Sequence, residues 1–178
     1  MARMPLNTRD PFAGYGPVSV MLHWLTAIAV VTLYLTHERD WSAIHLGIGL
    51  AVTPLFLLRV YWRVRRGYPR VSDQPAIFNL AARLVTLAFL VCILTVMVTG
   101  LLIPPLEGKP LAFFDLVSIA VPLPADRGWA SLLEELHDFA GHAFIPVIAL
   151  HVFGALAHHF IKRDAVLVRM LRPVRRGR

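Results

Sequence analysis

The sequence is short of cysteine and of charge, and acidic residues are scarcer than basic ones. Cys92 is the single cysteine among 178 residues, so no disulfide can form within the chain. Charged residues make up only 16% of the chain and hydrophobic residues 57%, with a mean hydropathy of +0.61. A soluble globular domain carries about 25% charged residues. The composition therefore excludes that class and indicates an integral membrane protein.

Four runs that are almost free of charge are long enough, with their flanks, to cross a bilayer. A membrane-spanning helix needs about 20 mostly apolar residues. The second run is the shortest, and it spans fully only if Arg59 and Arg63 extend into the headgroup region. We predict an all-α fold with a single domain over residues 1–178, a membrane-embedded four-helix bundle. Its helices are expected at about residues 18–36, 44–62, 77–103 and 132–161.

The basic residues are distributed by membrane side. Fifteen of the eighteen Lys and Arg lie before the first helix, around the second connection from Arg59 to Arg83, or in a basic tail at 162–178. The positive-inside rule places these segments in the cytoplasm, so both termini are predicted to be cytoplasmic. Nucleic-acid binding favours a basic face with interleaved aromatic residues. The chain lacks that pattern, and we expect membrane lipid rather than nucleic acid as a partner.

The third connection, about residues 104–131, is long and rich in proline. Pro104 and Pro105 are expected to end the third helix. The apolar stretch LAFFDLVSIAVPL has only about 12 residues between Lys109 and Pro122, too few to cross a membrane. We therefore predict an outer-surface or re-entrant segment.

Two histidines, His137 and His151, lie fourteen residues apart in the last apolar helix. A helix turns about 100° and rises about 1.5 Å per residue, so the second imidazole returns to within roughly 40° of the first, about 21 Å further along. One face of this helix therefore presents an imidazole near each side of the membrane.

Two further histidines stand at matching depths. The topology puts His23 on the cytoplasmic side of the first helix and His45 on the outer side of the second. The partners that depth allows are His151 for His23 and His137 for His45. An imidazole is costly in lipid and usually faces a bundle interior, a cavity or a partner. We interpret the four histidines as two separate sites.

Haem fits two imidazoles better than zinc does. Zinc prefers three or four ligands, whereas haem needs only two axial ligands and brings an apolar ring that fits between helices. Without a Cys-x-x-Cys-His motif, such a haem would be held without thioether bonds. We predict two b-type haems that serve electron transfer, because two imidazoles leave iron no open position. A non-haem transporter, with histidines that relay protons or bind metal, is the remote alternative.

A candidate quinone site lies at the cytoplasmic end. His158 follows His151 by seven residues, on the same face and about 10 Å nearer the cytoplasm. There its imidazole could hydrogen-bond a quinone carbonyl, and Trp24, beside His23, could line a cofactor edge. The alternatives are an interfacial histidine at a helix end and a tryptophan of the aromatic belt.

Two histidines are given no cofactor role. His142 lies about 140° around the helix from His137, and we assign it to packing. His37 falls in the outer turn and is expected to be solvated.

The chain resembles the bacterial cytochrome b561 family, di-haem four-helix membrane cytochromes related to the cytochrome b subunits of nickel-iron hydrogenases and formate dehydrogenases. The resemblance covers about residues 18–171. It is carried by LHW at 22–24, IHLGIG at 44–49, LHD at 136–138 and ALHVFGALAHHF at 149–160. The last motif, with the fourteen-residue histidine spacing, is the specific part.

The resemblance implies haem b ligation by four residues, which are His23, His45, His137 and His151. It also implies the bacterial inner membrane as location, electron exchange with ubiquinone and, in some members, oxidation of superoxide at the outer face. The predicted outer connections are net negative and would repel superoxide rather than steer it. A second hypothesis is a cytochrome b subunit that anchors a periplasmic redox partner such as a hydrogenase. The apolar stretch in the third connection would be its docking surface.

Overall fold

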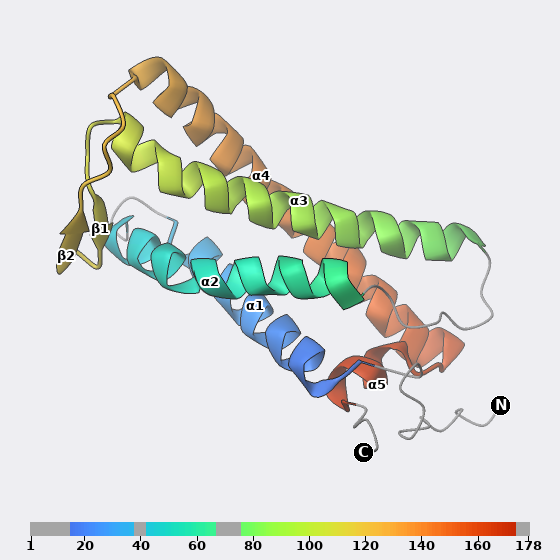
Figure 1. Cartoon of the computed structure of the whole chain (residues 1–178). Coiled ribbons are helices and arrows are strands. Elements are labelled where there is room, and N and C mark those ends of the chain that lie inside the picture. The colour runs from blue at the N-terminus through green and yellow to red at the C-terminus, as the bar shows by residue number, and fades with distance from the viewer. Residues whose placement is uncertain (1–14, 38–41, 67–75, 174–178) are drawn as a thin grey trace.

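The computed structural model describes residues 15–37, 42–66 and 76–173. Four long helices form the molecule: α1 (Pro17–Leu35), α2 (Ser42–Arg66), α3 (Ala76–Leu106) and α4 (Arg127–Ala157). All four are long and apolar enough to cross a membrane. Successive helices run in opposite directions, so that α1 begins and α4 ends at the same end of the bundle (Figure 1). The all-α prediction and the four expected spans are confirmed.

Four short elements complete the fold. The strands β1 (Leu111–Phe113) and β2 (Val117–Ile119) form an antiparallel hairpin beyond the bundle (Figure 1). After α4 the chain makes one π-helical turn, η2 (His158–Lys162), and a last helix, α5 (Val166–Leu171). We call the end with the strands the hairpin end. The opposite end, where α1 begins and α4 ends, is the basic end.

The third connection shows how the apolar stretch is used. Its residues pair as two strands with Ala112 opposite Ser118, and the turn between them holds Phe114 and Asp115 at φ 51° and 57°. The backbone hydrogen bonds of the stretch are therefore partly made within the hairpin. The stretch lies outside the four helices, as an outer-surface segment would.

Several helix ends differ from the predicted ones. Helix α2 continues to Arg66 rather than ending at 62, and α4 gives way to the π-turn after Ala157 rather than continuing to 161. The prediction that α3 ends before Pro104 was wrong, because the helix continues through both prolines to Leu106. The carbonyls of Pro104 and Pro105 then accept hydrogen bonds from Lys109 and Gly108, which closes the last turn. Helix α4 begins five residues before the predicted Leu132. The carboxylate of Asp126 caps it by accepting from the backbone N–H groups of 128 and 129, at 2.9 and 3.1 Å.

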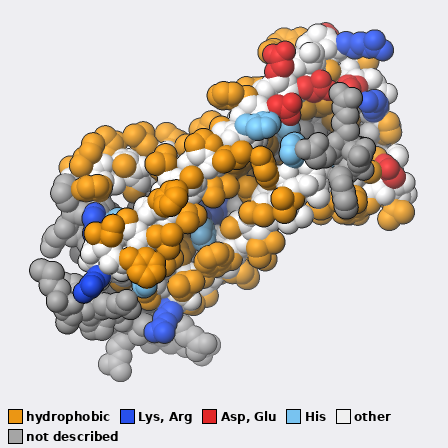
Figure 2. All heavy atoms as spheres, turned by 180° about the vertical axis from the view of Figure 1, so that it is seen from behind, with side chains coloured by type: hydrophobic (Ala, Val, Ile, Leu, Met, Phe, Trp, Pro, Cys, Tyr) orange, Lys and Arg blue, Asp and Glu red, His pale blue; other side chains and the backbone are white. Residues whose placement is uncertain are grey.

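The helices pack most extensively as α3 against α4 and α1 against α2. A small apolar core joins all four at mid-height, formed by Ala29, Phe56, Cys92, Ile93 and Phe144. Much of the remaining apolar surface is exposed, as Figure 2 shows along the length of the bundle. Such a surface suits lipid rather than water.

Some predicted features lie outside the described residues. They are the N-terminal lead-in up to residue 14, part of the first outer turn at 38–41, most of the Arg-rich second connection at 67–75, and the end of the basic tail at 174–178.

Candidate functional site

The four membrane histidines face one another in two pairs. The rings of His23 in α1 and His151 in α4 have centroids 5.9 Å apart and planes inclined by 59°. The rings of His45 in α2 and His137 in α4 are 6.0 Å apart and inclined by 75°. These are the pairings that depth alone predicts. We call the first the inner pair and the second the outer pair.

Helix α4 holds one member of each pair, His137 and His151. The fourteen residues between them place both imidazoles on nearly the same face of the helix. Midway between them stands Phe144, which is 5% exposed and belongs to the apolar core. Its ring lies 6.2 Å from that of Phe89, which in turn meets the ring of His151 edge to face at 5.5 Å. The two pairs are therefore separated by a packed aromatic layer.

Uncharged groups orient the outer pair. Nδ1 of His45 lies 3.0 Å from the carbonyl oxygen of Leu33, which can only accept, so the proton of this ring stands on Nδ1. Nδ1 of His137 lies 2.8 Å from Oγ1 of Thr99, whose own proton goes to the Thr95 carbonyl at 2.7 Å. Both rings thus donate from Nδ1 and leave Nε2 as the nitrogen that can bind a metal.

Close packing supports this arrangement around His137. Thr99 is 2% exposed. A Cβ at Gly100, the next residue of α3, would stand 3.1 Å from Cε1 of His137. The backbone of α3 can approach the imidazole this closely because residue 100 has no side chain.

The inner pair has a charged neighbour. Arg59 donates from one guanidinium nitrogen to the carbonyl of Ser19 at 3.2 Å and from the other to Nδ1 of His23 at 3.3 Å. Its side chain is half-buried in the bundle. The expectation that Arg59 extends to the headgroups was therefore wrong. Because a guanidinium only donates, Nδ1 of His23 accepts here, the reverse of the outer pair.

Trp24 stands next to this pair. Its ring meets that of His23 edge to face at 5.4 Å. The indole N–H donates across 2.9 Å to the backbone carbonyl of Met170 in α5. Trp24 thus ties the C-terminal helix to α1 below the inner pair, a contact that the sequence did not reveal.

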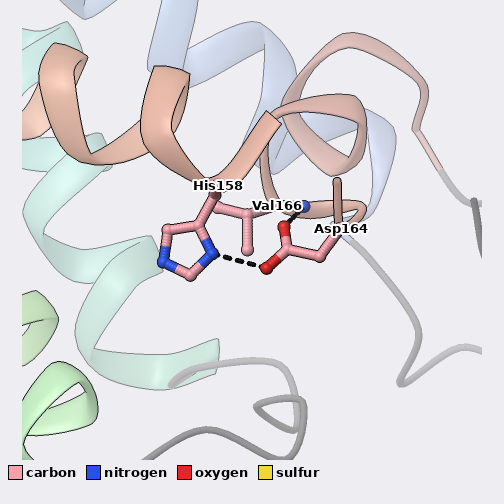
Figure 3. A network of polar contacts seen from close by, with 3 residues as sticks. All are labelled: His158, Asp164 and Val166. Atoms are coloured by element: carbon pink, nitrogen blue, oxygen red, sulfur yellow. Dashed lines mark hydrogen bonds and ion pairs between the residues drawn. The ribbon is translucent and has the colours of Figure 1, made fainter. Parts of the chain in front are cut away.

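His158 stands at the first residue of η2, and Figure 3 shows its neighbours. Nδ1 of His158 lies 2.5 Å from one carboxylate oxygen of Asp164, and the other oxygen accepts from the backbone N–H of Val166 at 3.0 Å. Sequence reasoning missed Asp164, because its contact depends on the π-turn and on Arg163 at φ 56°. The only feature of the sequence that pointed to this contact is the position of an acidic residue directly after Lys162 and Arg163.

The other two outer histidines also lie near each other. Nδ1 of His142 bonds to the backbone carbonyl of Asp138 at 2.8 Å, and His37 stacks on the ring of Tyr34. The two imidazole centroids are 6.2 Å apart. His37 is exposed, as predicted for the outer turn.

The donor chemistry of the two membrane pairs suits haem. Within the described part of the chain, no group of three or more His, Cys, Asp or Glu side chains is close enough to hold a metal ion. Each pair instead offers two nitrogens among apolar residues, which is what axial ligation of haem iron requires. At Gly141 and Gly154, four and three residues beyond His137 and His151 on α4, an added Cβ would meet nothing within 4 Å.

Comparison with known proteins agrees with this chemistry. The model of the family described as prokaryotic cytochrome b561 matches residues 14–173. The chain is similar to a cytochrome b561 homologue of Escherichia coli, with 29% identity over 170 residues that cover 88% of this chain and 90% of the relative. It is also similar to cytochrome b562 of Cereibacter sphaeroides, with 28% identity over 93% of this chain and 99% of the relative. A protein of Yersinia pestis named a probable superoxide oxidase is 26% identical over 92% of this chain and 98% of its own length.

Proposed function

The chain belongs to the prokaryotic cytochrome b561 family, whose members are membrane cytochromes b with a role in electron transfer, and we propose that it carries two b haems which conduct electrons across the membrane. The observation that carries the proposal is the presence of two imidazole pairs, with 5.9 and 6.0 Å between ring centroids, whose members on α4 lie fourteen residues apart. His45 and His137 would hold the outer haem, and His23 and His151 the inner haem. Each haem would supply one-electron redox chemistry at an iron with no open position.

The residues around the two pairs place the ring protons differently, so the two pairs are not equally ready to bind iron. His45 and His137 already carry their protons on Nδ1, so Nε2 of each is ready to bind iron. His23 would carry its proton on Nδ1 only after Arg59 gives up its hydrogen bond there. Arg59 can keep its bond to the Ser19 carbonyl and remain as a positive charge beside the inner haem.

At the basic end we propose a quinone site that includes His158 and Trp24. Reduction of a quinone to a quinol takes two electrons and two protons. Asp164 holds Nδ1 of His158, so Nε2 of the same ring can accept and release a proton (Figure 3). His158 lies about 10 Å along the helix from His151. A quinone there would receive electrons from the inner haem and protons through this histidine. Ubiquinone is the quinone that the family resemblance suggests.

The donor would act at the hairpin end, which would be periplasmic. The similarity to a probable superoxide oxidase favours superoxide, of which two would be oxidised to oxygen for each quinone reduced. The alternative is a periplasmic redox partner, such as a hydrogenase, for which this chain is the cytochrome b anchor. The exposed apolar side chains of the hairpin, Leu116, Val117 and Ile119 at 83%, 57% and 53%, favour that alternative.

One set of measurements tests the proposal on the purified protein. We expect a b-type band in the reduced-minus-oxidised spectrum and two haems per chain. Superoxide should reduce the haems and a ubiquinone analogue should reoxidise them. A spectrum without haem would overturn the whole proposal and favour the transporter alternative. If the haems are present but superoxide does not reduce them, the anchor alternative is favoured, and a copurified redox enzyme would identify the donor.

The quinone site is tested by variants at the basic end. Asp164→Asn and His158→Gln should slow reoxidation by quinone and leave reduction from the hairpin end unchanged. His159→Gln is the matched control, because the ring of His159 meets that of its neighbour Phe160 edge to face at 4.8 Å. Equal reoxidation rates in all three variants would move the quinone site elsewhere.

A further inference from the structure

The four long helices form two halves. Helix α3 packs along α4 and α1 along α2, and contacts between these halves are fewer than contacts within them. Each membrane histidine pair has one ring on each half, because His23 and His45 lie on α1 and α2 and both of their partners lie on α4. The separation of the halves therefore sets the distance between the two imidazoles of each pair.

The hairpin of β1 and β2 is anchored on the half formed by α3 and α4. Where the chain leaves α3, the backbone N–H of Lys109 donates to the carbonyl of Pro104 at 2.8 Å. The backbone N–H of Asp126, which caps α4, donates to the carbonyl of Leu106 at the end of α3, also at 2.8 Å. These bonds close the base of the third connection, so the hairpin is fixed to α3 and α4.

The tip of the hairpin reaches the other half at Gly47. Strand β1 contacts α2 about as extensively as the whole of α3 does, and Figure 1 shows it near the start of α2. Gly47 is buried, and a Cβ built there would stand 2.5, 2.6 and 2.8 Å from three carbons of the Phe114 ring. Because residue 47 has no side chain, the ring can lie directly on the backbone of α2.

The turn that carries Phe114 has a conformation that does not suit this residue. Phe114 and Asp115 occupy its two central positions, at φ 51° and 57°, and the backbone N–H of Leu116 donates to the carbonyl of Phe113 at 3.0 Å. Turns with positive φ at both central positions favour Asn-Gly, and a bulky residue is rare there. The position of Phe114 is therefore maintained by its contacts rather than by local preference.

We propose that Phe114 is a positioning residue for the outer haem, an inference that rests on the proposed function. Gly47 follows His45 by two residues, about 200° around the helix, so the Phe114 ring lies on the side of α2 opposite to His45. There it holds α2 at a fixed separation from α4, whose His137 supplies the second imidazole. The inner imidazole of α4 lies about 21 Å further along the helix and does not depend on this contact.

Phe114→Asn separates positioning from the shape of the turn. Asparagine suits the turn, so a residue that only shaped the hairpin could be replaced without loss. We expect instead that the outer haem is retained at least about tenfold more weakly, which corresponds to about 1.4 kcal/mol, and that inner-haem retention is unchanged. Transfer of haem from the purified full-length protein to an apoprotein acceptor measures both. Leu116→Asn is the matched control, because Leu116 follows in the same turn with its side chain 83% exposed.

Electron paramagnetic resonance of the oxidised protein gives a second readout. The g values of a low-spin haem depend on the angle between its two imidazole planes, so a displaced His45 should shift the signal of the outer haem alone. Gly47→Ala should shift it as well, because the added methyl group displaces the Phe114 ring. The double variant Gly47→Ala with Phe114→Asn should resemble Phe114→Asn alone, since residues in contact have non-additive effects.

The outcomes separate this inference from the proposed function. If Phe114→Asn and Leu116→Asn show the same outer-haem retention and g values, the inference is overturned and the proposed function stands. Equal loss of both haems in Phe114→Asn would also overturn it, because the effect would then be on the whole bundle. Absence of haem from the unsubstituted protein would overturn the proposed function and this inference together. Should Gly47→Ala fail to fold, Phe114→Asn decides alone.

Discussion

The two membrane histidine pairs are alike in spacing and unlike in surroundings. Their centroid separations differ by only 0.1 Å, 5.9 against 6.0 Å. The outer pair is held by a carbonyl and a hydroxyl, which are neutral. The inner pair has the Arg59 guanidinium hydrogen-bonded to His23. Two similar pairs of imidazoles are therefore placed in two different electrostatic environments.

This difference predicts the direction of electron flow. A nearby positive charge stabilises the reduced, less positive form of a haem and raises its reduction potential. Arg59 would raise the potential of the inner haem, whereas Asp138 directly follows His137 of the outer pair in the sequence. Electrons would then move downhill from the hairpin end to the basic end, toward the proposed quinone.

The largest effect is expected from removing a ligand. His151→Ala should abolish the inner haem and leave the outer one, and His45→Ala should do the opposite, so that haem per chain falls from two to one in each case. Pyridine haemochrome analysis gives the ratio, and a redox titration identifies the haem that remains. His159→Ala should keep both haems. Loss of both haems from either single change would contradict two independent sites.

Replacing Phe144 tests whether the aromatic layer between the two histidine pairs stabilises both haem sites equally. Phe144→Ala would leave a cavity in the apolar core, and such changes cost about 3–5 kcal/mol. We expect a lower temperature of haem loss for both sites. The matched control is Phe153→Ala on the same helix, whose side chain is 71% exposed and faces away from the core. A change confined to one haem would show that Phe144 belongs to that site alone.

Thr99 probes the outer pair alone. Thr99→Val removes the acceptor of the His137 Nδ1–H and leaves a buried donor unsatisfied, which costs about 1–3 kcal/mol. Loss of such a supporting hydrogen bond typically weakens metal affinity 10–100-fold, so outer-haem occupancy should fall while the inner haem is retained. Thr86→Val is the control, because Thr86 bonds only to the Ala82 carbonyl within α3. Equal loss in the two variants would point to a general effect of threonine replacement.

The smallest of these effects is expected from removing the positive charge of Arg59. Arg59→Gln should lower the inner-haem potential by on the order of 50 mV, close to the 59 mV that corresponds to a tenfold change in a one-electron equilibrium. Arg59→Lys should restore most of it. Arg65→Gln is the control, since Arg65 packs over the ring of Tyr61 at 5.7 Å. An unchanged inner-haem potential in Arg59→Gln would contradict the proposal that Arg59 raises the potential of that haem.

Much of the fold was predictable from local properties. Charge-free runs gave the four helices, because length and hydropathy decide what can cross a bilayer. Their ends were less predictable. The prolines at 104 and 105 do not stop α3. Their carbonyls accept hydrogen bonds from the backbone N–H groups of Lys109 and Gly108, six and five residues beyond the predicted end of the helix. The cap at Asp126 extends α4 into a segment that lacks the strong hydropathy of a span.

The candidate site was predicted in part. The fourteen-residue spacing and the topology selected the same two pairs that the structure brings together. The groups that hold the rings were not predictable, because Leu33, Thr99 and Arg59 come from helices whose rotation about their own axes the sequence does not specify. The contact of His158 with Asp164 likewise depends on a π-turn that no periodicity indicated.

The sequence by itself determined that this chain has four helices long and apolar enough to cross a membrane, and it predicted which histidines share a depth. Both properties follow from the order of residues along a helix and from the fixed thickness of a bilayer. Only the tertiary structure decided what surrounds each imidazole. Helix rotation brings neutral acceptors to one pair and a guanidinium to the other. The folding back of the chain after α4 brings Asp164 to His158, and helix packing brings His37 and His142 together, although 105 residues separate them.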